Sequence, residues 1–185
     1  SDLISRDRTL GFTAGGEDGE SSDSKVANYE RMKNNGAKGR EGWLKELREE
    51  EGRRTEKLMP LFLSDNTPIH PYRLAWEINE FLTEDTIYIG DGGDIVTISA
   101  QAVQPRGPGN WMDPGALGSL GVGTGFALAA GLAHPNKEVV CLYGDGSFGM
   151  TAFDMETANR FGAPYIAVVG NNSHMNQIRY GQIAK

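Results

Sequence analysis

Two patterns of apolar residues follow one another along the second half of the chain. Short continuous apolar runs predict strands at 86–89, 138–143 and 165–169, of the kind that are buried on both faces of a parallel sheet. Between them, apolar residues recur at helical spacing, which predicts helices starting at Pro71 and over 95–103, 126–132 and 151–161. The segment 105–115 is rich in glycine and proline and is expected to be a loop.

Strands that alternate with helices favour an α/β fold with an open parallel sheet and helices on both faces. In such sheets, ligands bind at the carboxyl ends of the strands. Here three strands run into glycine and polar residues: GDG at 90–92, GDG at 144–146 and GNN at 170–172. The pattern therefore predicts a ligand site at that edge of the sheet.

The first third of the chain has a different character. Segment 15–24 (GGEDGESSDS) is expected to be flexible and solvated, and 43–59 is expected to be a charged helix with a short apolar stripe at Trp43, Leu44 and Leu47. We interpret 1–65 as a partly disordered, partly helical connector or the end of a middle domain. Residues 66–185 are then one domain.

Charge and cysteine content narrow the function classes. A net charge of −7 argues against general binding to nucleic acid or to an anionic membrane. The one cysteine, Cys141, cannot form an internal disulfide or a metal cluster, and we expect a small buried strand residue in a cytoplasmic protein. Segment 116–133 lacks charged residues, but its glycines weaken a helix by about 1 kcal/mol each, which favours a buried helix over a membrane span.

Asp145 and Asn172 are the strongest candidates for chemistry. Each follows a predicted buried strand, so a parallel sheet would bring them together. Mg²⁺ prefers oxygen ligands and is commonly bound by one or two protein groups together with substrate phosphates. The neighbouring glycines would let a diphosphate approach the backbone, and a helix starting after Ser147 would offer N–H groups to the anion.

GDGS at 144–147, followed by NN at 171–172, resembles the metal-binding motif of thiamine-diphosphate-dependent enzymes, with Asn172 placed 27 residues after Asp145. The resemblance implies the diphosphate-binding domain of that superfamily, with thiamine diphosphate and Mg²⁺ as cofactors. It implies that Asp145, Asn172 and the backbone of His174 hold the metal.

The resemblance extends to GSLG at 118–121 and covers roughly 68–185. It implies that Leu120 supports the V conformation of the cofactor and that the carbonyl of Gly118 receives its 4′-amino group, which then reaches the proton on C2. The cofactor contacts that it implies are Gly93, Asp94, Gly118, Leu120, Gly144, Asp145, Gly146, Ser147, Asn172, His174 and Met175. Gln177 and Ile178 are expected to line the substrate pocket.

Within the superfamily, the residues around the motif look most like 2-hydroxyacyl-CoA lyase, oxalyl-CoA decarboxylase and acetolactate synthase. Ile178 stands where relatives of pyruvate decarboxylase have a glutamate. The resemblance implies a carbon–carbon lyase or ligase that acts on 2-hydroxyacyl-CoA or 2-oxo acid substrates. A 2-hydroxyacyl-CoA lyase is the first choice and an acetolactate-synthase-like carboligase the second.

Such enzymes also need a glutamate from a pyrimidine-binding domain, which we do not find here. We expect a domain truncated at its C-terminus, inactive alone, from a homodimer or homotetramer with the active site at a subunit interface. Two alternatives stay open: a non-catalytic Mg²⁺–nucleotide module, in which Leu120 has no role, and a structural domain that has lost its ligand.

Overall fold

The computed structural model describes the backbone of residues 22–183, and the chain divides into two units, Ser1–Glu50 and Glu51–Lys185. Helix α1 (Ser22–Phe62) contains the predicted segment 43–59 and is much longer, with Pro60 in its last turn. Of the segment predicted to be flexible, 15–21 lies outside the described residues, whereas 22–24 begins α1, so the prediction is wrong there. The apolar stripe at 43–47 is exposed to solvent.

In the unit Glu51–Lys185, the end of α1 packs against the helix that follows it. The ring of Phe62 is buried and stacks on Trp76 with 4.9 Å between ring centroids. Ala75 and Ala102 complete this small cluster. The domain boundary predicted at residue 65 stays a prediction.

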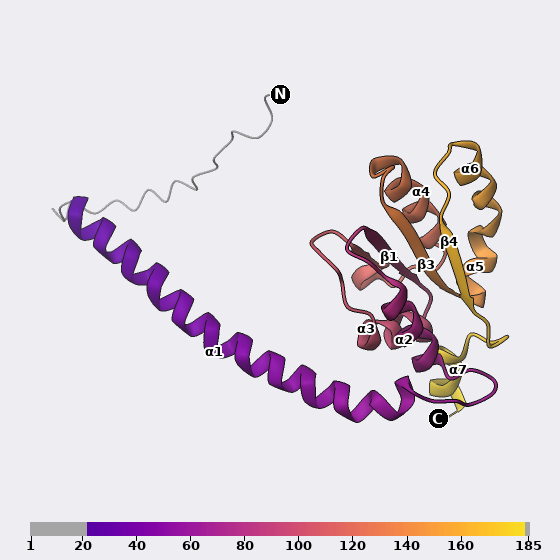
Figure 1. Ribbon diagram of the computed structural model, residues 1–185, viewed down its shortest axis with the longest axis horizontal. Coiled ribbons are helices and arrows are strands. Elements are labelled where there is room, and N and C mark those ends of the chain that lie inside the picture. The colour runs from indigo at the N-terminus through magenta and orange to yellow at the C-terminus, as the bar shows by residue number, and fades with distance from the viewer. Residues whose placement is uncertain (1–21, 184–185) are drawn as a thin grey trace. The chain divides into compact units, whose positions relative to one another are not determined.

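A four-stranded parallel sheet forms the centre of this unit (Figure 1). Its strands are β1 (Thr86–Asp91), β2 (Trp111–Met112), β3 (Glu138–Gly144) and β4 (Ile166–Gly170), in the order β2-β1-β3-β4. The α/β fold class with a parallel sheet is confirmed. Strand β2 lies inside the predicted loop 105–115 and was missed, because two residues are too few to show a periodicity.

In the part of the chain that the structure describes, α1 is followed by the helices α2 (Pro71–Phe81), α3 (Asp94–Ala102), α4 (Gly123–Ala133), α5 (Asp145–Thr151), α6 (Met155–Arg160) and α7 (Asn176–Ile183). Short 3₁₀ turns lie at Gly115–Leu117 and Ala152–Asp154. Helix α2 begins as expected at a proline, and the side chain of His70 caps it by accepting the N–H of Tyr72 at 3.2 Å.

Two predictions about helices are wrong. The helix expected at 151–161 is not continuous, because α5 ends at Thr151, a 3₁₀ turn covers Ala152–Asp154 and α6 begins only at Met155. The helix start expected after Ser147 lies earlier, at Asp145. Helix α7 was not predicted at all. The start of α5 could not be predicted from the sequence, because glycines at 144, 146 and 149 normally disfavour helical structure.

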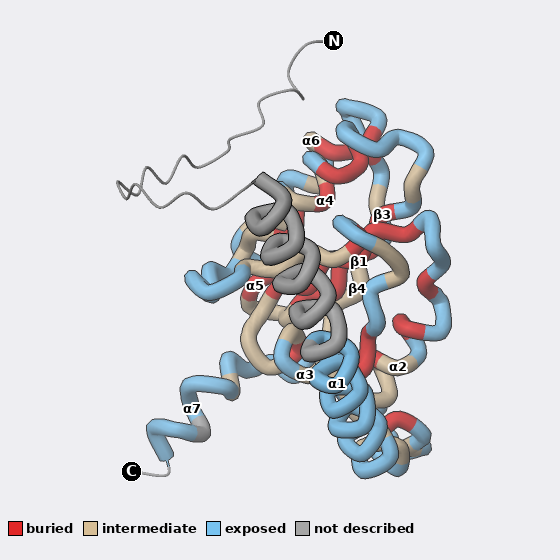
Figure 2. Tube along the Cα trace, turned by 90° about the vertical axis from the view of Figure 1, so that its left-hand side faces the viewer, coloured by how far each residue is buried: buried red, intermediate tan, exposed pale blue. Residues whose placement is uncertain are grey.

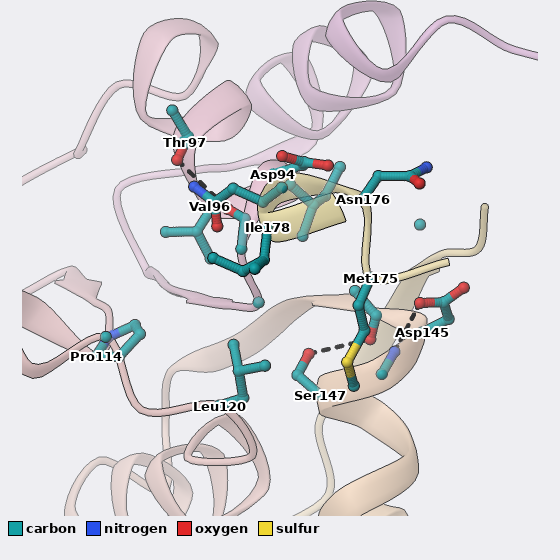
Figure 3. Close-up of a pocket in the computed structure, with 18 of the residues that line it drawn as sticks. Asp94, Val96, Thr97, Pro114, Leu120, Asp145, Ser147, Met175, Asn176 and Ile178 are labelled. Carbon is teal, nitrogen blue, oxygen red and sulfur yellow. Dashed lines mark hydrogen bonds between the residues drawn. The ribbon is translucent and has the colours of Figure 1, made fainter. Parts of the chain in front are cut away.

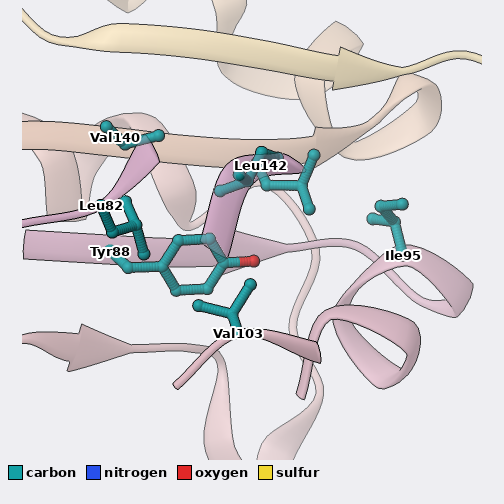
Figure 4. Close-up of a cluster of buried hydrophobic side chains, with 7 residues drawn as sticks. Leu82, Tyr88, Ile95, Val103, Val140 and Leu142 are labelled. Atoms are coloured by element: carbon teal, nitrogen blue, oxygen red, sulfur yellow. The ribbon is translucent and has the colours of Figure 1, made fainter. Parts of the chain in front are cut away.

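Apolar side chains bury both faces of the sheet. On one face, Tyr88, Val140 and Leu142 pack with residues of α2 and α3 (Figure 4). On the other face, Ile89 and Cys141 pack with residues of α4. Buried positions therefore concentrate in the strands, whereas α7 is exposed (Figure 2).

Cys141 is fully buried on β3, which confirms its predicted place as a small core residue. Burial raises the pKa of its thiol to about 12, so the group stays uncharged at neutral pH. Of the helices in the described part of the chain, none is both long and apolar enough to cross a membrane.

Two glycines of α4 offer a matched test of core packing. A Cβ at Gly123 would meet Tyr143 Cε1 at 2.6 Å and Asp91 Cβ at 2.8 Å, whereas a Cβ at Gly125 would meet nothing within 4 Å. We expect Gly123→Ala to lower the free energy of unfolding by about 1–3 kcal/mol or more through overpacking. Gly125→Ala should raise it by about 0.4–1 kcal/mol.

Urea denaturation followed by circular dichroism measures both changes. Equal stabilities of the two variants would contradict the packing described for the start of α4.

Candidate functional site

A cavity of about 470 Å³ lies at the carboxyl ends of β1, β3 and β4 (Figure 3). Its wall is formed by the loops after these strands, by the segment before α4 and by the start of α7. Every residue that the sequence assigned to cofactor, metal or substrate lines it: Gly93, Asp94, Gly118, Leu120, Gly144, Asp145, Gly146, Ser147, Asn172, His174, Met175, Gln177 and Ile178. Their individual roles stay predictions.

The pairing of β3 with β4 brings the two candidate metal ligands to one edge. Gly144 and Gly170 are direct partners in the parallel register. Asp145 comes one residue after the first and Asn172 two residues after the second, so both lie beyond the same ends of neighbouring strands.

Local hydrogen bonds hold these two side chains. Asp145 Oδ1 accepts the N–H of Gly146 at 2.7 Å, and Asn172 Oδ1 accepts the N–H of His174 at 3.0 Å. The ring nitrogen Nδ1 of His174 lies 2.8 Å from the carbonyl oxygen of Asn172. Among the described residues, no hydrogen bond occupies Asp145 Oδ2, which leaves one carboxylate oxygen available to a ligand.

The donor set fits Mg²⁺ together with a diphosphate. The described residues contain no cluster of three or more His, Cys, Asp or Glu side chains that would bind a metal by themselves. Here the side chains of Asp145 and Asn172 line the same cavity, and a Mg²⁺ ion held by one carboxylate and one amide oxygen keeps positions for phosphate oxygens.

Glycines keep the floor of the cavity close to the backbone. Gly92 has φ +144°, and a Cβ there would meet the nitrogen of Gly144 at 3.0 Å, so the ends of β1 and β3 approach each other without side chains between them. A Cβ on Gly146 would meet Met175 Cε at 2.6 Å, and one on Gly93 would meet the amide of Gln177. The nearest atoms above these two glycines belong to flexible, exposed side chains.

Leu120 also lines the cavity and points into it (Figure 3). It is 36% exposed, which is high for a leucine that serves only the core. Gly118, at the start of its loop, has the left-handed φ of 60°. Val96, Pro114 and Ile178 give the cavity an apolar side as well.

Sequence reasoning missed the residue that holds the Leu120 loop. Asp91, at the end of β1, is fully buried and accepts the N–H groups of Gly121 (3.0 Å) and Gly123 (2.7 Å). Its carbonyl accepts the hydroxyl of Ser147 at 2.8 Å. The available signal was a carboxylate directly after the short, mainly apolar run of β1, which the sequence shows but does not explain.

The hydroxyl of Ser147 is engaged by the protein backbone, although the sequence suggested a contact to the cofactor. Ser147 is buried, and its hydroxyl lies 3.0 Å from the carbonyl of Gly144 besides its bond to Asp91. The side chain therefore joins the ends of β1 and β3 beneath the cavity. Thr97, Asp113, Pro114 and Asn176 line the cavity without having been singled out from the sequence.

A parallel α/β sheet with a glycine-lined cavity at the carboxyl ends of its strands is the arrangement expected of a diphosphate-binding domain. The family described as "Thiamine pyrophosphate enzyme, C-terminal TPP binding domain" matches residues 91–185, and the chain belongs to this family. The resemblance seen in the sequence is thereby confirmed.

Curated relatives agree with the family. The chain is 41% identical to 2-hydroxyacyl-CoA lyase 2 of Mus musculus over 148 residues, which is 77% of this chain and 23% of that protein. It is 46% identical to 2-hydroxyacyl-CoA lyase 2 of Danio rerio over 115 residues, covering 62% of this chain and 18% of that protein. It is 34% identical to the acetolactate synthase large subunit IlvG of Mycobacterium tuberculosis over 147 residues, covering 80% of this chain and 27% of that protein. The chain thus spans about a quarter or less of the relatives that it matches.

Gly146 and Gly149 of α5 test whether the glycine floor serves ligand binding. A Cβ at Gly146 displaces only the flexible end of Met175, and a Cβ at Gly149 meets nothing within 4 Å, so both alanine variants should keep the unfolding free energy within about 1 kcal/mol of the original. Gly146→Ala should weaken binding of thiamine diphosphate about tenfold or more, because the methyl group overpacks the floor.

Thermal unfolding and calorimetric titration of the full-length protein measure the two effects. Gly149→Ala is the matched control and should bind as the original does. Unchanged affinity in Gly146→Ala would show that the diphosphate does not approach this glycine.

Proposed function

We propose that the protein containing this chain binds thiamine diphosphate through Mg²⁺ and cleaves or forms a carbon–carbon bond next to a carbonyl group. The observation that supports this most is the convergence of Asp145 and Asn172 at the ends of paired strands, with Leu120 across the same cavity. When bound, thiamine diphosphate supplies an electron sink for the carbanion that such a reaction produces.

The residues of this chain would bind and orient that cofactor. The carboxylate of Asp145, the amide oxygen of Asn172 and the carbonyl of His174 would hold the metal, in keeping with the oxygen ligands that Mg²⁺ prefers. The glycine backbone at 144–146 would let phosphate oxygens come close. Leu120 would support the bent shape of the cofactor, and the carbonyl of Gly118 would accept a hydrogen bond from its 4′-amino group.

For the substrate, we propose a 2-hydroxyacyl-CoA. The relatives named 2-hydroxyacyl-CoA lyase 2 share 39–46% of aligned residues with this chain. The mixed wall of the cavity, with Val96 and Ile178 beside polar groups, suits an acyl group that carries a hydroxyl. Gln177 and Ile178 line the cavity and are exposed, so both are available to contact a substrate.

A second candidate is an acetolactate-synthase-like carboligase. It is favoured by the 34% identity to the mycobacterial enzyme, which extends over 80% of this chain. Both candidates need an activating glutamate from another domain, so a homodimer or homotetramer with a shared active site belongs to the proposal. A cytoplasmic location, expected from the single cysteine, belongs to it too.

The metal ligand Asp145 gives the most direct mutational test. In the full-length protein, Asp145→Ala should weaken the Mg²⁺-dependent binding of thiamine diphosphate by more than about 100-fold, since even outer-shell changes cost 10–100-fold in metal affinity. Isothermal titration with and without Mg²⁺ measures this. Asp154→Ala, an exposed carboxylate outside the cavity, is the control and should bind normally.

Two other results of this titration would point to a different function. A folded original protein that binds a nucleotide but not thiamine diphosphate would replace this proposal with a nucleotide-binding module. A change in stability without any ligand binding would indicate a structural domain. Once binding is established, turnover of 2-hydroxyacyl-CoA esters against pyruvate distinguishes the lyase from the carboligase.

A further inference from the structure

Asp91 is unusual among the buried side chains. Of the buried polar residues in the described part of the chain, it alone is a carboxylate, and its exposed fraction is 0%. It lies directly before Gly92 but does not line the cavity itself. Its position therefore suggests an effect on the site through other residues.

The side chain of Asp91 holds the loop that carries Leu120. Its two carboxylate oxygens take different N–H groups: Oδ1 accepts from Gly121 at 3.0 Å and Oδ2 from Gly123 at 2.7 Å. These two residues flank the turn from the Leu120 loop into α4. A carboxylate that bridges two amides fixes both the position and the tilt of the segment between them.

Gly121 is held from a second side as well. Its carbonyl accepts the hydroxyl of Thr151 at 3.1 Å, and that hydroxyl also reaches Thr124 at 3.1 Å. Gly121 has φ +83°, and a Cβ there would meet Met150 Cβ at 3.0 Å, so the backbone is confined as well as bonded. Leu120 directly precedes Gly121 in the chain, so its position depends on this fixed geometry.

Stability alone does not account for a carboxylate here. Burial raises the pKa of Asp91 above its ordinary value, and the bonds from Gly123 and Gly121 only partly offset that rise. Because folding raises this pKa, ionising Asp91 costs more free energy in the folded chain than in the unfolded chain. The stabilising contribution of this group is therefore lost as the pH rises through the folded-state pKa.

We propose that Asp91 is a positioning residue for catalysis: its carboxylate sets the height and angle at which Leu120 enters the cofactor cavity. This inference rests on the proposed thiamine function, because Leu120 has no task without a bent cofactor to support. It goes beyond that function by assigning a role to a buried residue that touches neither cofactor nor metal.

The first test needs no cofactor. In the ligand-free full-length protein, hydrogen–deuterium exchange read by mass spectrometry should show peptides covering 118–124 protected, although much of this segment is loop. Asp91→Asn should speed that exchange about tenfold or more, because the amide offers one acceptor where the carboxylate offers two.

Thr86→Val is the matched control. Thr86 lies at the other end of β1, is equally buried and accepts one backbone N–H, from Thr83, at 3.1 Å. This variant should lose a comparable buried hydrogen bond and leave exchange in 118–124 unchanged.

The second test reads cofactor geometry rather than turnover. With thiamine diphosphate and Mg²⁺ bound, exchange of the C2 proton, quenched with acid and read by NMR, should slow by on the order of 10²-fold in Asp91→Asn, because small misplacements can cost that much. The affinity for thiamine diphosphate should change less than about threefold, since the metal ligands are untouched. Thr86→Val should keep the original C2 exchange rate.

The outcomes separate this inference from the proposed function. If the original protein binds no thiamine diphosphate, the proposed function fails, and this inference fails with it. If it binds and Asp91→Asn keeps both loop protection and C2 exchange, only the positioning role is overturned. Should Asp91→Asn not fold, rapid exchange of 118–124 in the original protein would still overturn it, because the amides of Gly121 and Gly123 must be held.

Discussion

Parallel pairing of β1, β3 and β4 fixes where chemistry can occur in this domain. Since the strands run the same way, Asp91 faces Tyr143 in one register and Gly144 faces Gly170 in the next. All three strands therefore end at the same edge of the sheet, and the residues that follow them line one cavity. The proposed metal-ligand pair, the glycine floor and the carboxylate that holds the Leu120 loop all follow from that common edge.

The same edge places two carboxylates in opposite environments. Asp145 starts α5, where one of its oxygens accepts only a local N–H and the side chain stays partly exposed to the cavity. Asp91 ends β1 beneath the surface, where both oxygens are used by backbone amides. The first arrangement suits an incoming cation, and the second suits a fixed scaffold. Ser147 joins the two levels through its bond to the carbonyl of Asp91.

Much of this could be predicted from the sequence because the strands are continuous apolar runs that end in glycine. That pattern placed β1, β3 and β4, and the interval between Asp145 and Asn172 indicated one shared site. What failed depends on tertiary contacts. The glycine-rich start of α5 becomes helical although glycine disfavours it, and β2 exists only by pairing Tyr88 with Trp111. Asp91 was seen as a strand end, but its partners at Gly121 and Gly123 lie 30 and 32 residues away.

We propose that one divalent cation lies between Asp145 and Asn172 and holds a diphosphate. A crystal structure of the full-length protein with thiamine diphosphate and Mn²⁺ in place of Mg²⁺ would test it most directly, since Mn²⁺ scatters anomalously and accepts the same oxygen ligands. We expect an anomalous peak at about 2.0–2.4 Å from the Asp145 carboxylate, the Asn172 amide oxygen and the His174 carbonyl. A peak elsewhere, or a bound cofactor without a cation at these residues, would contradict it.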